Sequence, residues 1–121
     1  MSQPPSGTRV LIVEDDTIIA MTAEDMLEEV GCITAAVAGT VAEALARAAD
    51  TDFDVALLDL NLREENSLPV ARALRDSGKH FIFATGYDGL PPDSGFADAP
   101  IISKPYRIEQ LAEVIARVLA A

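Results

Sequence analysis

The sequence has few cysteines, histidines and basic residues. Its single cysteine, Cys32, excludes an intramolecular disulfide and is typical of proteins in a reducing compartment. Only 9 lysines and arginines stand against 20 aspartates and glutamates, and the formal net charge is -11. Surfaces that bind nucleic acid or anionic membranes need a basic face. This charge balance therefore argues against both kinds of partner.

Long apolar runs are also missing. No apolar stretch reaches the about 18 residues that a membrane-spanning helix needs. The first residues, Met1 to Gly7, lack an apolar signal region, and we expect residues 1–8 to be a flexible leader. Half of the 121 residues are hydrophobic, which suffices for one domain with a single buried core. We therefore expect a soluble, cytoplasmic protein whose one domain spans residues 9–121.

Short apolar runs alternate with helical periodicity along the chain. These runs are typical of strands that are buried on both faces of a sheet, except the second, which is a mixed strand candidate. The runs cover residues 9–13, 32–38, 54–59, 80–85 and 99–103. Between them, Thr40 to Glu43 fits a capping box and Ser67 fits a helix N-cap.

This alternation predicts an α/β fold with a doubly wound, five-stranded parallel sheet in the order 2-1-3-4-5. The stretch from Tyr87 to Gly95 should hold the fourth helix of such a fold, yet it contains two prolines and two glycines. No helical period survives in it, so we expect the fourth helix to be short or missing. Ligands of this topology bind at the carboxyl ends of the strands.

Reactive side chains follow four of the five predicted strands. In strand order they are Glu14, Asp15 and Asp16, then Asp59, Thr85 and Lys104. Converging carboxylates repel each other unless a cation relieves them, and oxygen ligands suit Mg²⁺ above all. A lysine holds an anion as a point charge, and a hydroxyl opposite it completes a cradle. Around the free carboxylate of Asp59, this set describes an acceptor for a phosphoryl group.

Each of these residues also has a simpler interpretation. Aspartate is a common turn former, so Asp59 alone would serve to hold the turn after its strand. The acids from Glu14 to Asp16 would cap the following helix, and Lys104 would be a solvated residue before a proline. The lone histidine, His80, precedes the fourth strand at the end away from the other residues. We interpret it as structural and not as a phosphodonor.

As a set, these residues resemble the receiver domain of two-component response regulators. The likeness runs from Arg9 onward, and the residues that carry it are Glu14-Asp15, Asp59, Thr85 and Lys104-Pro105. The resemblance implies the flavodoxin-like receiver fold. It also implies that Asp59 accepts phosphate from a histidine kinase.

The same resemblance assigns roles to the neighbours of Asp59. It implies that Asp15, Asp59 and the backbone carbonyl of Asn61 bind Mg²⁺, while Glu14 acts through water. Thr85 would sense the phosphoryl group and Lys104 would pair with it. The family has a cis peptide before the proline that matches Pro105.

A narrower resemblance lies in the segment from Phe81 to Tyr87. It is similar to the Phe-x-Phe-Ala-Thr-Gly-Tyr segment of small receivers called FAT GUY receivers, although His80 stands where a proline is expected. Members of that subgroup are stand-alone regulators that work beside bacterial sensor kinases, often in stress or phosphorelay circuits. Many receivers carry Tyr or Phe three residues before the lysine; this chain has Ile101, so we do not expect an aromatic-flip switch.

We therefore interpret the chain as a single-domain response regulator phosphorylated on Asp59 with Mg²⁺ as cofactor, and not as an enzyme. Its expected partner is a sensor histidine kinase or a histidine phosphotransfer protein. It would signal through proteins or act as a phosphorelay carrier or sink. Two alternatives stay open: an interaction module in which phosphorylation is secondary, and a small phosphohydrolase suggested by Asp59-Leu60-Asn61.

Overall fold

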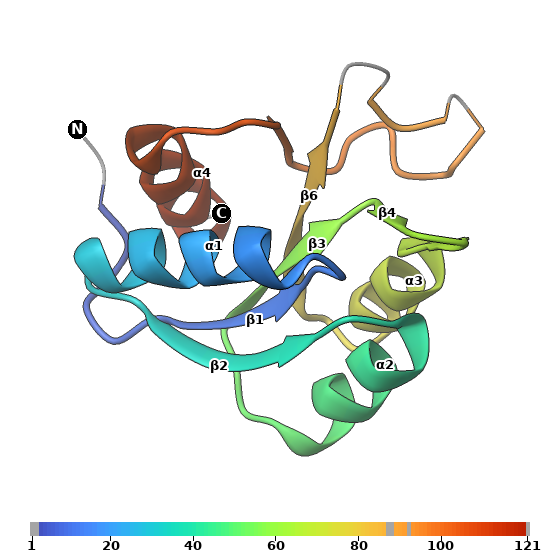
Figure 1. Cartoon of the computed structure of the whole chain (residues 1–121), viewed down its shortest axis with the longest axis horizontal. Helices are drawn as coiled ribbons and strands as arrows, with labels where there is room; N and C mark the ends of the chain where they lie inside the picture. Colours follow the sequence, from blue (N-terminus) through green and yellow to red (C-terminus); the bar gives the residue numbers. More distant parts are fainter. Residues whose placement is uncertain (1–2, 87–88, 92, 121) are drawn as a thin grey trace.

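The computed structural model contains a five-stranded parallel sheet with helices on both faces (Figure 1). It describes residues 3–86, 89–91 and 93–120. The strands of the sheet are β1 (Arg9–Val13), β2 (Ile33–Ala38), β3 (Val55–Asp59), β6 (His80–Thr85) and β7 (Ile101–Ser103). Their order is β2-β1-β3-β6-β7, which is the predicted order 2-1-3-4-5 because β4 and β5 lie outside this sheet. The predicted doubly wound α/β fold is thus confirmed.

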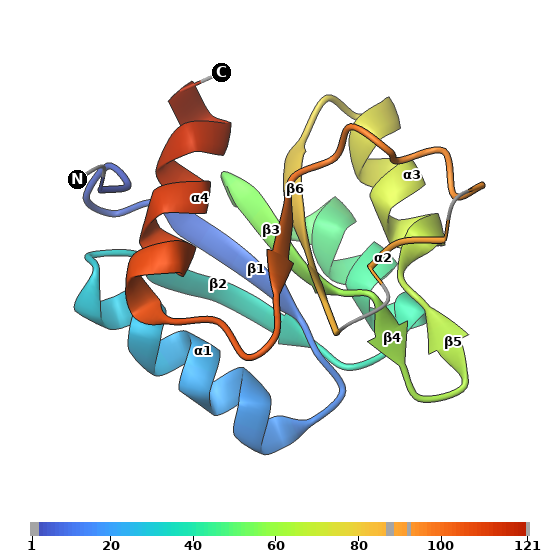
Figure 2. The ribbon, with the colours of Figure 1, turned by 90° about the horizontal axis from the view of Figure 1, so that it is seen from above.

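Within the described residues, four helices cover the sheet in two pairs. They are α1 (Thr17–Glu29), α2 (Val41–Asp50), α3 (Leu68–Asp76) and α4 (Ile108–Ala120). Figure 2 shows α1 and α4 on one side of the sheet and α2 and α3 on the other. The sheet has one hydrophobic core on each face. Along β1, Val10 and Ile12 pack into the core under α1 and α4, and Leu11 and Val13 pack into the core under α2 and α3. The strand is apolar at successive positions because both of its faces are buried. None of the described helices is both long and apolar enough to cross a membrane.

The connection between β6 and β7 has no helix in its described residues, which are 86, 89–91 and 93–100. The expectation of a short or missing fourth helix holds for them, while Tyr87, Asp88 and Pro92 lie outside the described residues. Phe96 closes the core instead. Its side chain is 3% exposed, and its ring packs edge-on against Phe81 and Phe83 at centroid distances of 5.7 and 5.5 Å.

The exposed side chain of Arg75 on α3 contacts this connection. Its guanidinium lies 4.3 Å from the centroid of the Phe96 ring, a cation–π contact. The same side chain donates a hydrogen bond from Nη1 to the carbonyl of Gly95 at 3.2 Å. The aromatic ring and the arginine together do the packing that a helix does elsewhere in the fold.

Both predicted N-cap residues, Thr40 and Ser67, occupy N-cap positions, but only Thr40 makes a side-chain capping bond. Thr40 Oγ1 accepts a hydrogen bond from the amide of Glu43 at 3.1 Å, as a capping box requires. Ser67 occupies the N-cap position of α3, but its buried hydroxyl has no hydrogen-bond partner in the described part of the chain. Asn66 Oδ1 accepts from the amide of Leu68 at 3.0 Å instead. Ser67 is thus the N-cap residue, as predicted, but its side chain makes no capping hydrogen bond.

A small hairpin follows β3 directly. Its strands are β4 (Asn61–Leu62) and β5 (Glu65–Asn66), which pair in antiparallel fashion. Arg63, in the turn between them, has a φ of 55°. This is the left-handed region, which costs an L-residue other than glycine about 1 kcal/mol or more.

The expected leader is described from residue 3 onward. The amide of Gly7 donates to the carbonyl of Gly31 at 2.8 Å, and Thr8 is buried. Contacts with the domain thus begin within the expected leader, where Pro4 is also buried. The flexibility of residues 1–8 stays a prediction.

Candidate functional site

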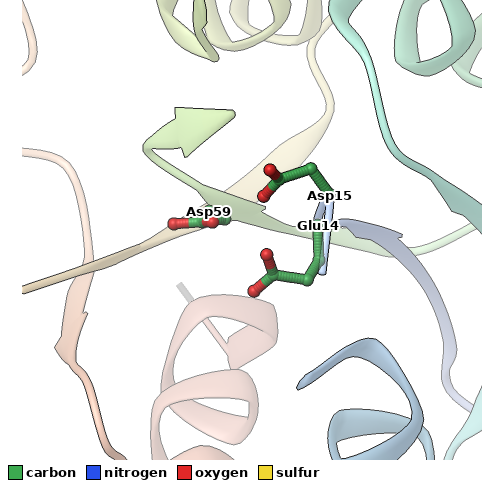
Figure 3. Close-up of side chains that lie close together, drawn as sticks. All are labelled: Glu14, Asp15 and Asp59. Atoms are coloured by element: carbon green, nitrogen blue, oxygen red, sulfur yellow. The ribbon is translucent and has the colours of Figure 1, made fainter. Parts of the chain in front are cut away.

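The sheet brings the predicted acids to one edge. Val13 pairs with Leu58, so the next residues on the two adjacent parallel strands are Glu14 and Asp59. Carboxylate oxygens of Glu14, Asp15 and Asp59 lie within 4.8 Å of one another. Figure 3 shows the side chains of Glu14 and Asp15 extending from the end of β1 toward Asp59 on β3.

Two of these acids are buried. Glu14 is 7% exposed and Asp59 is 6% exposed. Burial, together with the Asp59 carboxylate beside it, raises the pKa of Glu14 to about 7. Burial and the neighbouring carboxylate thus both disfavour a negative charge on Glu14.

Lys104 supplies a positive charge to both buried acids. Its Nζ lies 3.2 Å from Asp59 Oδ1 and 3.3 Å from Glu14 Oε1. Burial lowers the pKa of Lys104, but the carboxylates of Asp59 and Glu14 outweigh burial, and the net shift is upward. The lysine is therefore charged at neutral pH. The peptide bond between Lys104 and Pro105 is cis, as the resemblance implied.

Two further predicted residues follow the same sheet edge. Thr85 ends β6, and Asn61 begins β4, two residues after Asp59. Asp59 pairs with Ala84, so Thr85 is one residue beyond the level of Asp59. Thr85 is buried, and its hydroxyl donates to the carbonyl of Gly86 at 3.2 Å. Asn61 belongs to β4, where it pairs with Asn66, and its side chain is exposed.

Asp16 takes no part in the acidic cluster. Its Oδ1 accepts hydrogen bonds from the amides of Ile18 and Ile19 at 2.9 and 3.1 Å. Asp16 is therefore the N-cap of α1, which is the simpler interpretation of the two.

Sequence reasoning missed two residues of the hairpin. Arg63 Nε donates to Asp15 Oδ2 at 3.1 Å, and Glu65 Oε2 accepts from the amide of Val41 at 3.0 Å, at the start of α2. These pairs are 48 and 24 residues apart in the chain. No local pattern signals contacts of such long range.

Tyr106 was also missed. It is half-buried and lines a small cavity of about 10 Å³ together with Glu14 and Asp59. Burial and then the two acids raise the pKa of its phenol to about 12. The only sequence signal was its place two residues after Lys104.

The donor set suits one kind of guest. Three carboxylates that converge from two strands offer oxygen ligands only, which are those that hard divalent cations such as Mg²⁺ prefer. Such a cation would also relieve the mutual repulsion of the acids. The residues present therefore fit a divalent cation.

Comparisons with known proteins agree with this geometry. The profile of the response regulator receiver domain family matches residues 10–116. The solution structure of SdrG from Sphingomonas melonis Fr1 is 44% identical, with a TM-score of 0.81 over 93% of this chain and 97% of that chain. The BeF3-activated conformation of SdrG from Pseudomonas melonis Fr1 is 43% identical, with a TM-score of 0.80 over 95% of this chain and 98% of that one.

One curated relative is a larger protein. The protein-glutamate methylesterase/protein-glutamine glutaminase 2 of Caulobacter vibrioides is 43% identical over 54 residues. The match covers 45% of this chain and only 16% of that protein. The profile match spans most of the chain, and the five-stranded fold agrees with it. This chain belongs to the response regulator receiver domain family.

Proposed function

We propose that this receiver is a stand-alone response regulator that takes a phosphoryl group onto Asp59 from a sensor histidine kinase or a histidine phosphotransfer protein. The observation that carries the proposal is the setting of Asp59, which lies beside two further carboxylates and 3.2 Å from the Lys104 ammonium. In the transfer, a carboxylate oxygen of Asp59 bonds to phosphorus as the phosphorus–nitrogen bond of the phosphohistidine breaks. The imidazole keeps the electron pair of the broken bond.

Asp15, Asp59 and the backbone carbonyl of Asn61 would hold Mg²⁺, with Glu14 acting through water. The bound ion supplies positive charge to the phosphoryl oxygens during transfer. Lys104 neutralises Asp59 before transfer. Because its ammonium already lies at the acceptor oxygen, it is placed to pair with the phosphoryl group afterwards.

Thr85 is the residue that reports the new charge. Its hydroxyl donates to the carbonyl of Gly86 at 3.2 Å, a long and therefore weak hydrogen bond. A phosphoryl oxygen on Asp59 is a stronger acceptor, so the hydroxyl turns toward it. That rotation breaks the contact with Gly86 and passes the signal into the connection after β6.

The likeness to SdrG supports the stand-alone type, since the two chains match over nearly their whole lengths. Assignment to the FAT GUY subgroup rests on the segment from Phe81 to Tyr87, whose residues Phe81 and Phe83 pack against Phe96. A response to phosphate mimics is expected by analogy with the BeF3-activated conformation of SdrG. We further propose that the protein acts in the cytoplasm and carries out no catalysis on a separate substrate.

Intact-mass analysis tests the proposal. The protein is incubated with a small acyl phosphate, with Mg²⁺ or with EDTA. Wild type should gain the mass of one phosphoryl group only with Mg²⁺, and Asp59→Asn should gain none. Asp54→Asn is the matched control, because Asp54 is exposed just before β3 begins, at the other end of that strand. Unchanged labelling of Asp59→Asn would show that the acceptor has been misassigned.

A further inference from the structure

Arg63 has a backbone conformation that arginine rarely adopts. Its φ of 55° makes it the one non-glycine residue with positive φ in the described ranges. Glycine or asparagine adopts this conformation at lower cost. A strained backbone at a residue of the wrong type directs attention to what the side chain does.

The side chain of Arg63 reaches back to the acids. Its Nε donates to Asp15 Oδ2 at 3.1 Å, and the arginine side chain is 80% exposed while that of Asp15 is 18% exposed. The hairpin that carries Arg63 is fixed on both sides. Leu62 is 2% exposed in the core, and Glu65 accepts a hydrogen bond from the start of α2. Arg63 is therefore held over Asp15 by an anchored turn.

The two cations divide the three acids between them. Lys104 pairs with Glu14 and Asp59, and Arg63 pairs with Asp15. A divalent ion bound by Asp15 would meet the guanidinium at the same carboxylate, where like charges repel. Lys104 is three-quarters buried, but Arg63 is mostly in solvent, so Arg63 is the cation that leaves at little cost.

We propose that Arg63 is a built-in competitor of the divalent cation. It neutralises Asp15 while no metal is bound, and metal binding displaces it from Asp15. This inference rests on the Mg²⁺ site of the proposed function. As a consequence, the protein should bind Mg²⁺ more weakly than the acids alone would. The Arg63 side chain should pair with Asp15 only while no metal is bound.

Calorimetric Mg²⁺ titration of the full chain tests the competition. An exposed ion pair of this kind corresponds to about a two- to fivefold difference in affinity, so Arg63→Gln should bind Mg²⁺ that much more tightly than wild type. Arg63→Lys keeps the charge and should stay closer to wild type. Arg117→Gln removes the same charge in the last turn of α4, outside the cluster of Glu14, Asp15 and Asp59, and should leave the affinity unchanged.

A second measurement follows the arginine itself. In the metal-free protein the Nε–H NMR signal of Arg63 should shift on Asp15→Asn, and saturating Mg²⁺ should shift the wild-type signal in the same direction. Equal affinities for wild type and Arg63→Gln, an equal gain in Arg117→Gln, or an Nε–H signal indifferent to Mg²⁺ would each overturn the competition. If wild type still binds Mg²⁺ in those cases, only the competition by Arg63 is refuted and the proposed metal site is retained. A wild type that binds none overturns both.

Discussion

The ammonium of Lys104 lies 3.2 Å from Oδ1 of Asp59, although β7 and β3 are not neighbours in the sheet. The strand between them, β6, ends at Thr85, whose carbonyl accepts a hydrogen bond from the Lys104 amide at 2.7 Å. The lysine side chain thus crosses the end of β6 to reach the acid. It links β7 to the central strand of the sheet through an ion pair.

Removal of Lys104 should weaken the metal-free fold. Lys104→Ala leaves Glu14 and Asp59 buried without their cation, which costs several kcal/mol in a dry interior. Because the lysine side chain is 25% exposed, we expect a smaller loss, about 1 to 2 kcal/mol in urea unfolding. Mg²⁺ should restore part of it. Lys104→Arg, which keeps the charge, should lose less, and equal losses in the two variants would contradict the electrostatic cause.

The metal-free acids should repel each other measurably. Asp15→Asn removes one charge from the cluster and also loses an exposed ion pair with Arg63, which is worth little. The net result should be a rise in the melting temperature in EDTA, by a few degrees for about 1 kcal/mol. The same variant should lose the increase that Mg²⁺ gives to wild type, because ligand linkage needs binding. A wild-type melting temperature that does not change with Mg²⁺ would contradict the proposed metal site.

Ser67 and Asn66 should respond to alanine with opposite signs. An N-cap serine normally loses about 1 kcal/mol on substitution by alanine. The buried hydroxyl of Ser67 has no partner among the described residues, and an unpaired buried hydroxyl costs about 1 kcal/mol or more. Ser67→Ala should therefore leave stability unchanged or raise it. Asn66→Ala, which removes the actual cap on Leu68, should lower it by about 1 kcal/mol in chemical denaturation.

Phe96 should be among the most sensitive residues outside the site. Phe96→Ala empties a buried position between Phe81 and Phe83, and we expect a loss of about 3 to 4 kcal/mol. Phe96→Leu, which refills most of the volume, should lose much less. Arg75→Gln should lose about 1 kcal/mol, from the cation–π contact and the hydrogen bond to Gly95. A harmless Phe96→Ala would mean that the ring does not close the core.

The thiol of Cys32 should set a pH dependence on the alkaline side. Burial, and then the carboxylate of Asp54, raise the pKa of Cys32 above its usual range. Because the folded-state pKa is the higher one, the thiol favours folding below the unfolded-state pKa of about 8.5. This contribution is lost as the pH rises through the folded-state pKa. The stability difference between wild type and Cys32→Ser should shrink from about pH 8.5 upward, and native Cys32 should alkylate slowly. A constant difference would show that no shift exists.

The sheet could be predicted because its strands are apolar on both faces. Short runs such as residues 9–13 and 54–59 have only one stable place, in the middle of a covered parallel sheet. Parallel strands then force their carboxyl ends to one edge, so the meeting of Glu14, Asp59 and Lys104 follows from the topology. The lack of a helix in the described residues between β6 and β7 could be predicted from the prolines and glycines there.

Features that depend on one side chain reaching a distant partner could not be predicted. The segment from Asn61 to Asn66 has no glycine at its turn, so nothing local indicates a hairpin. Arg63 adopts φ of 55° there, against its own preference. Ser67 occupies the predicted N-cap position, yet its hydroxyl makes no capping bond, while Asn66 accepts from the Leu68 amide. At Arg63 the departure from local preference goes with a contact to Asp15, 48 residues away in the chain.

The distance along the chain between the acids and their lysine has a consequence for synthesis on the ribosome. Lys104 follows its partner Glu14 by 90 residues, and β7 is the last strand to emerge. A nascent chain with β1 and β3 already translated would expose Glu14 and Asp59 without that cation. Since domains fold as units during translation, the acidic edge should assemble only after β7 has left the exit tunnel. An unfinished chain should therefore lack the assembled edge that the proposed phosphorylation of Asp59 needs.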